Sequence, residues 1–190
     1  IVPNTPFSEP EYKNKYKYKY TKTAAPAGGN TYPKDSNGEI DYVAYESKSF
    51  SKQDYIDMYF FAKGLVIPHH YHGVSQVAAT YLNREHNIPF IDFYKKLFEY
   101  SRNGDGILNE EYINHTNSLK DSLFKNKTWG RTIEGGDDFH IQDNGATASF
   151  LYRNIDKVHK EIIDICKKEY NVDVSEACQF NKHIIDTYER

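Results

Sequence analysis

The 190-residue sequence lacks any apolar run that approaches the roughly 20 residues needed to cross a bilayer. It also lacks the short signatures of several large enzyme classes. There is no G-x-S-x-G elbow, no Walker-type phosphate loop, no dinucleotide fingerprint, no C-x-x-C pair and no H-E-x-x-H helix. These absences argue against a membrane span and against several common catalytic machineries.

Cysteine is scarce, and the two residues present are placed in a suggestive way. Cys166 and Cys178 lie symmetrically about Val172, between two segments that we expect to be helical. In an antiparallel helical hairpin, residues equidistant from the turn lie opposite each other. We therefore predict a Cys166–Cys178 disulfide that contributes about 2–4 kcal/mol in an oxidising compartment. Two separate buried thiols are the alternative.

Three features together predict a secreted, extracellular glycoprotein. The printed chain begins at Ile1, which indicates a trimmed chain or a mature protein whose leader has been removed. Asn114 and Asn126 each begin an N-x-S/T sequon. The expected disulfide is the third feature.

The composition indicates one globular domain over residues 11–190, preceded by an extended arm at 1–10 that carries three prolines. Hydrophobic residues make up 38% of the chain, with 17 tyrosines and 11 phenylalanines. The formal net charge is -3, so the chain as a whole does not attract polyanions. A nucleic-acid role would therefore need a local basic patch.

Residues 11–22, EYKNKYKYKYTK, alternate lysine and tyrosine. Read as a strand, this segment separates the two residue types onto opposite faces. Tyrosines bind bases and lysines bind phosphates most readily when they share a surface. We therefore expect a half-buried strand here. RNA stays a candidate partner, because long lysines at an edge can still reach a phosphate.

Helical periodicity dominates after residue 50. We expect helices over these ranges: 51–64 (ended by Gly64), 73–86, 88–101, 109–124, 146–170 and from 175 onward. On the last helix the expected inner face consists of Ala177, Phe180, Ile184 and Tyr188. A second strand over 40–47 is expected to pair with the first. The predicted fold is α+β and predominantly α-helical, with a short N-terminal β-hairpin packed on a helical body that ends in a disulfide-linked αα-hairpin.

Two stretches contain candidate catalytic groups. His69, His70 and His72 follow Pro68, and an extended backbone would point His70 and His72 the same way. The glycine-rich stretch 127–145 contains the other candidates, which are Arg131, Asp138 and His140. There His140 is a candidate acid or base, a carboxylate its orienting partner, and Arg131 an anchor for phosphate or carboxylate. The alternatives are a surface turn and a solvated acidic loop.

Residues 101–112, SRNGDGILNEEY, resemble a calcium loop of the EF-hand or dockerin type. The resemblance places Asn103, Asp105 and the carbonyl of Ile107 at ligand positions. Ser101 and Tyr112 stand where that loop normally has an acid and a bidentate glutamate. A helix–turn–helix joint that uses Asn-Gly-Asp-Gly for its backbone is the alternative, and any calcium site would be weak.

These features support three functional hypotheses. The first is a small secreted enzyme of the ribonuclease-toxin type that cleaves RNA without a cofactor. Its catalytic candidates are His70, His72, His140, Arg131, Asp138 and, in the N-terminal arm, Glu9. The second is a secreted binding or adhesion module with tyrosine-rich surfaces and a degenerate calcium loop. The third is a zinc- or iron-dependent hydrolase that uses His70, His72 and His140.

Overall fold

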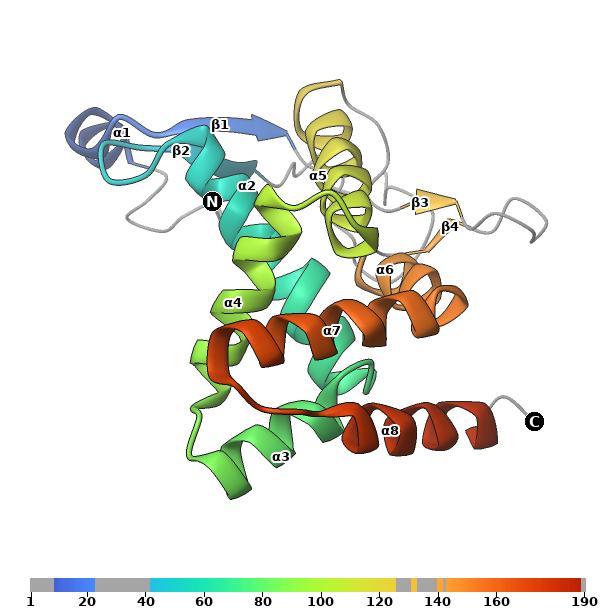
Figure 1. The fold of residues 1–190 in the computed structure, drawn as a ribbon. Coiled ribbons are helices and arrows are strands. Elements are labelled where there is room, and N and C mark those ends of the chain that lie inside the picture. The colour runs from blue at the N-terminus through green and yellow to red at the C-terminus, as the bar shows by residue number, and fades with distance from the viewer. Residues whose placement is uncertain (1–8, 23–41, 126–130, 133–139, 142, 189–190) are drawn as a thin grey trace. The chain divides into compact units, whose positions relative to one another are not determined.

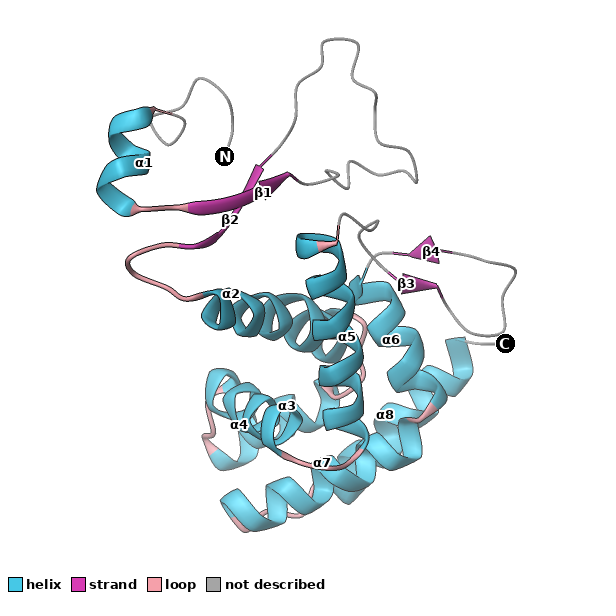
Figure 2. Cartoon of the chain, turned by 90° about the horizontal axis from the view of Figure 1, so that it is seen from above, coloured by secondary structure: helices cyan, strands magenta, loops and turns pink. Residues whose placement is uncertain are grey.

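A computed structural model describes residues 9–22, 42–125, 131–132, 140–141 and 143–188. Helices make up most of this part of the chain, and its strands form two small antiparallel pairs (Figures 1 and 2). The prediction of a mainly helical α+β protein is therefore confirmed. The elements are α1 (Pro10–Tyr16), β1 (Lys19–Lys22), β2 (Tyr42–Glu46), α2 (Lys52–Tyr59), η2 (Phe60–Tyr71), α3 (Gln76–His86), α4 (Phe90–Asn103), α5 (Ile107–Phe124), β3 (Arg131–Thr132), β4 (His140–Ile141), α6 (Asp143–Arg153), α7 (Ile155–Tyr170) and α8 (Ser175–Tyr188).

The chain divides into two compact units. Residues 1–59 and 116–143 form what we call the sheet unit, and residues 60–115 and 144–190 form the helical unit. The helix α5 contributes its first part to the helical unit and its last part to the sheet unit. Each unit is described by itself.

The sheet unit is built on the β1–β2 pair and a small apolar cluster. The two strands are antiparallel, with Lys19 opposite Glu46, Lys22 opposite Tyr42, and an irregularity between Lys19 and Tyr20. Behind β2, the side chains of Ile56, Leu119 and Leu123 form a buried cluster. The partly buried side chains that pack on this cluster are Val43, Tyr55 and Tyr59.

The helical unit has one continuous apolar core. Its largest fully buried apolar side chains include Phe60, Phe93 and Leu97. The single helix expected over 146–170 is instead two helices, α6 and α7, divided at Asn154. The apolar stripe predicted on it is buried throughout; its residues are Leu151, Ile155, Val158, Ile162 and Ile165. Helices α7 and α8 form the expected hairpin and lie side by side in Figure 1. Asn171 ends α7 in the left-handed conformation, with φ of 55°.

Two local predictions are wrong because tertiary contacts or helix signals outweigh the simple pattern. Residues 10–16 form a helix instead of the start of a strand, since Pro10 occupies the first turn, where its missing N–H costs nothing. Gly64 does not end a helix. The π-helix η2 continues through Gly64 and Pro68, and Gly64 lies where a Cβ would be 2.4 Å from the Phe60 ring.

The predicted disulfide is also wrong. Cys166 and Cys178 are both free and both lie in the main core of the helical unit. Burial raises the pKa of each thiol to about 12, so each side chain packs as a small neutral hydrophobe. Equal distance from a turn brings two residues near each other but does not give two sulfurs bonding geometry. The cysteines therefore no longer count toward an oxidising compartment.

Candidate functional site

The helical conformation of residues 10–16 brings lysines and tyrosines together. Tyr12 and Tyr16 are four residues apart on α1, and their ring centroids are 5.7 Å apart. Lys17 then ends the helix in the left-handed region, and the chain turns so that Tyr18 stacks on Tyr16 at 5.6 Å and 28°. The three rings form one continuous row, each partly exposed.

Lysine ammonium groups lie against these rings. The Nζ atom of Lys15 is 5.2 Å from the Tyr16 centroid and 6.0 Å from the Tyr12 centroid. The Nζ atom of Lys13 is 5.3 Å from the ring of Tyr20, a side chain that is 41% exposed. These distances are within the range of cation–π attraction. We call this set the lysine–tyrosine surface; its residues are Tyr12, Lys13, Lys15, Tyr16, Lys17, Tyr18 and Tyr20.

The lysine–tyrosine surface has a strong local positive charge. Residues 10–22 contain five lysines and one glutamate. Lys19 forms an ion pair with Glu46, with 2.7 Å between Nζ and the carboxylate oxygen, so the two charges compensate each other. The hydrogen bond in this pair raises the pKa of Lys19. Within the described part of the chain, no carboxylate forms an ion pair with Lys13, Lys15 or Lys17. Three ammonium groups thus remain available on a protein whose net charge is -3.

His69, His70 and His72 lie in different surroundings, because the backbone of His69 and His70 is helical, at the end of η2, instead of extended. His69 is buried, its Nδ1 is 2.9 Å from the Ser75 hydroxyl, and burial next to His159 lowers its pKa to about 3. His70 is half-buried, and its Nδ1 forms a hydrogen bond with the Tyr94 hydroxyl, 3.2 Å away. Burial raises the pKa of Tyr94, so this hydroxyl stays neutral. His72 is exposed and lines a hollow of about 390 Å³.

The other catalytic candidates are only partly described. Arg131 lies on β3 opposite Ile141, and His140 lies on β4 opposite Thr132. Asp138 and the side chain of His140 lie outside the described residues. Glu9 is exposed at the start of α1. Their joint action with His70 and His72 therefore stays a prediction. Among the described residues, no three histidine, cysteine or acidic side chains are arranged to hold a metal.

The calcium-like segment is organised as a helix–turn–helix joint. The carboxylate of Glu161, on α7, accepts hydrogen bonds from the backbone N–H groups of Ile107 and Leu108, the second at 3.2 Å. Glu161 thereby caps the start of α5. A Cβ on Gly106 would lie 2.1 Å from a Glu161 oxygen, so this approach requires glycine. Asn103 ends α4 and Asp105 is exposed in the turn. Calcium binding through Asn103, Asp105 and Ile107 stays a prediction.

The sequence analysis missed a buried network of three hydrogen-bonded polar side chains in the helical unit. Thr147 donates its hydroxyl proton to Glu111 at 2.7 Å, so the His115 ring must donate from Nδ1 to the Thr147 oxygen at 3.0 Å. All three side chains are almost fully buried. The one available signal was the spacing of Glu111 and His115, four residues apart on one helix face.

Comparison with known proteins identifies no relative of this chain. No family model matches the sequence, and a search of curated proteins finds none that is similar. With both cysteines free and no family or relative to support it, the prediction of a disulfide-bonded hydrolase, ribonuclease or toxin is not sustained. The described helices include none that combines the length and hydropathy needed to cross a membrane.

Proposed function

We propose that the protein is a binding module for single-stranded RNA and that the lysine–tyrosine surface makes the contact. The single observation that carries the proposal is the position of the Lys15 ammonium group, 5.2 Å from the Tyr16 ring, within a row of three neighbouring tyrosine rings. Single-stranded nucleic acids are held by this combination, in which bases stack on aromatic rings and cations contact phosphates.

The chemistry of the surface favours a strand with accessible bases over other polyanions. A duplex or a sulfated polysaccharide offers phosphates or sulfates but no free aromatic face, so it would leave the tyrosines unused. The row Tyr12–Tyr16–Tyr18 supplies stacking platforms, and the Lys15 ammonium group lies over two of its rings. Lys13, which lies over Tyr20, and Lys17 belong to the same short segment. Because both contributions come from one short segment, the expected affinity is modest and depends strongly on salt.

The test measures binding of a fluorescent 20-nucleotide oligouridine by anisotropy at several salt concentrations. Three phosphate contacts predict a slope of log K against log salt of roughly -2, at about 0.7 per contact on a single strand. The substitutions Lys13→Glu, Lys15→Glu and Lys17→Glu together should reduce affinity by at least about tenfold. A charge control is Lys157→Glu with Lys160→Glu, two exposed positions on α7 that are not part of the lysine–tyrosine surface.

The tyrosines are tested by Tyr16→Ala against Tyr16→Phe. Loss of one stacked base costs about 1–3 kcal/mol, so Tyr16→Ala should weaken RNA binding, while Tyr16→Phe keeps the ring and the affinity. Heparin is the second ligand, because it has charge without bases, and its binding should not respond to Tyr16→Ala. The proposal fails if the triple lysine variant binds oligouridine as the natural sequence does, or if Tyr16→Ala weakens heparin and RNA equally.

A further inference from the structure

The apolar stripe of α8 faces outward, although its pattern predicts an inner face. Phe180 is 58% exposed and Ile184 is 36% exposed. The residues of α8 that are buried instead are Cys178 and the polar Asn181. The expectation that Phe180 and Ile184 line the core is therefore wrong.

Asn181 holds α8 in this rotation. Its side-chain amide donates to the Val74 carbonyl at 3.1 Å and accepts from the Val77 N–H at 3.3 Å. The ring of His159 donates from Nε2 to the same Val74 carbonyl at 3.0 Å. A buried amide must keep such partners, so α8 cannot turn Phe180 inward without leaving Asn181 unsatisfied.

The outward stripe is continuous with an apolar surface on α3, the helix that packs against α8. A hollow of about 500 Å³ lies between Tyr81, Val77 and Phe180. A second hollow, of about 390 Å³, continues past Val77 to Ile184 and Tyr71, a ring that is 78% exposed. We call this the α3–α8 groove; its apolar residues are Tyr71, Val77, Tyr81, Phe180 and Ile184.

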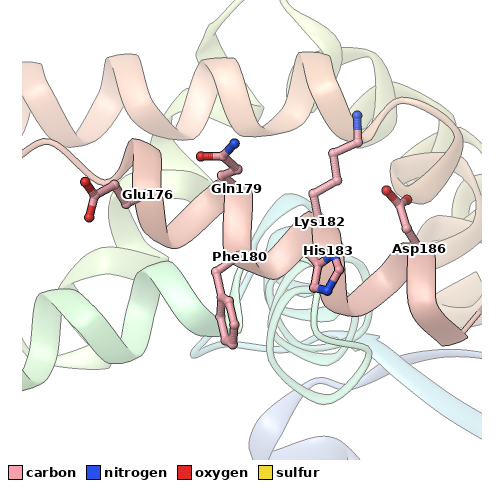
Figure 3. A pocket seen from close by; sticks show the side chains of 6 residues that line it. All are labelled: Glu176, Gln179, Phe180, Lys182, His183 and Asp186. Atoms are coloured by element: carbon pink, nitrogen blue, oxygen red, sulfur yellow. The ribbon is translucent and has the colours of Figure 1, made fainter.

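The charges beside the groove have one predominant sign. Asp173 and Glu176 line its first hollow, and Asp173 also forms an exposed ion pair with Lys167 at 3.6 Å. The Ser175 N–H lowers the pKa of Asp173, so this carboxylate stays ionised. Among the described residues that line these two hollows there is no lysine or arginine. Figure 3 shows Lys182, which is paired with Asp156, and Asp186 on the opposite side of α8 from Phe180.

We propose that the α3–α8 groove binds a cationic amphipathic helix of a partner protein. Two packed helices form a groove that accepts the ridge of a third helix. The partner's apolar residues, three and four positions apart, would contact Phe180, Val77 and Ile184, and its lysines or arginines would face Glu176 and Asp173. Within the described residues the helical unit has no strand whose edge could pair with an extended peptide. We expect a micromolar Kd, because only one face of the partner helix would contact the groove.

The test uses two synthetic 15-residue helical peptides with the same leucine positions, one with lysine at all other positions and one with glutamate. The lysine peptide should bind the full chain with a Kd in the range of about 1–100 μM, at least about tenfold tighter than the glutamate peptide. Phe180→Ser with Ile184→Ser should abolish that binding. The matched control is Ile91→Ser, because Ile91 is 47% exposed on α4 of the same unit and lies outside both hollows.

A charge exchange makes the test specific to the groove. Glu176→Lys, at a residue that lines the first hollow, should remove the preference for the lysine peptide. Equal binding of both peptides, an unchanged preference in this variant, or full binding by the Phe180→Ser, Ile184→Ser variant would overturn the proposal. Self-association that is abolished by Phe180→Ser and Ile184→Ser would also overturn it, since a second copy would then occupy the groove.

Discussion

The two units of the molecule are stabilised in different ways. In the helical unit, twenty described residues form one buried apolar cluster, whereas the main cluster of the sheet unit contains three. The helix α1 of the sheet unit has no buried residue at all. A segment without a core role can change its surface residues at little cost in stability, and α1 contains four residues of the lysine–tyrosine surface, Tyr12, Lys13, Lys15 and Tyr16. The helical unit instead has polar and titratable groups inside its core, and these make its stability sensitive to conditions.

Acid should produce the largest effect and should act on the helical unit. His69 has a pKa of about 3 in the folded protein, against about 6.5 when unfolded. The unfolded chain therefore binds a proton that the folded one excludes, and stability falls as the pH drops from about 6.5 toward 3. At pH 5 the loss from His69 alone is about 2 kcal/mol, and burial of His159 adds to it. Urea unfolding at pH 7.5, 6 and 5, followed by circular dichroism, measures the loss.

The control for this prediction is His69→Asn. The asparagine amide can replace the hydrogen bond between Nδ1 and Ser75 but does not titrate. The variant should be less stable at pH 7.5 and should depend less on pH between 7.5 and 5. An unfolding free energy of the natural sequence that is flat over this range would mean that the histidines are not held neutral in a dry core.

Glu161 should give an intermediate effect. Replacing it by alanine removes the carboxylate that caps the first N–H groups of α5, which costs about 1–2 kcal/mol. Glu161→Gln keeps an acceptor without the charge and should lose less. Asp164→Ala, at an exposed position of the same helix, should leave the urea midpoint unchanged. Equal stability of Glu161→Ala and the natural sequence would show that the joint is held by apolar contacts alone.

Reductant should have the smallest effect. A disulfide would contribute about 2–4 kcal/mol, which amounts to several degrees in Tm. Because Cys166 and Cys178 are free, millimolar reductant should shift Tm by less than about 1 °C. Thiol titration in urea should find both cysteines reactive in the absence of reductant. A chain that shows no titratable thiol under those conditions would contradict the structure.

The sequence predicts the elements whose periodicity agrees with their packing. The helices near residues 73–86, 88–101 and 109–124, and the stripe of α7, were identified because their apolar residues face the core. The rotation of α8 was missed, since its hydrophobic pattern says nothing of the hydrogen bonds that Asn181 makes across 107 residues to Val74. Tertiary contacts of this kind outweigh local pattern.

The candidate site was also recognised only in part. Residues 11–22 stood out for their lysines and tyrosines, but alternation was read with a period of two, and this reading separated the two residue types. In the structure, residues 10–16 form the helix α1, and its period of 3.6 puts Tyr12 and Tyr16 on one face. The separation expected from a strand therefore does not apply to these residues. A short helix is difficult to identify from sequence because its pattern covers only two turns.

The amide of Asn181 has a consequence for anyone who engineers this protein. Because a buried side chain fixes the rotation of α8, the set of α8 side chains that is exposed to solvent can be changed without a substitution at any exposed position. Asn181→Asp keeps the acceptor for the Val77 N–H but removes the donor to the Val74 carbonyl, and so would weaken the contacts that fix the rotation of α8. Solubility screens that mutate only surface positions would overlook this site.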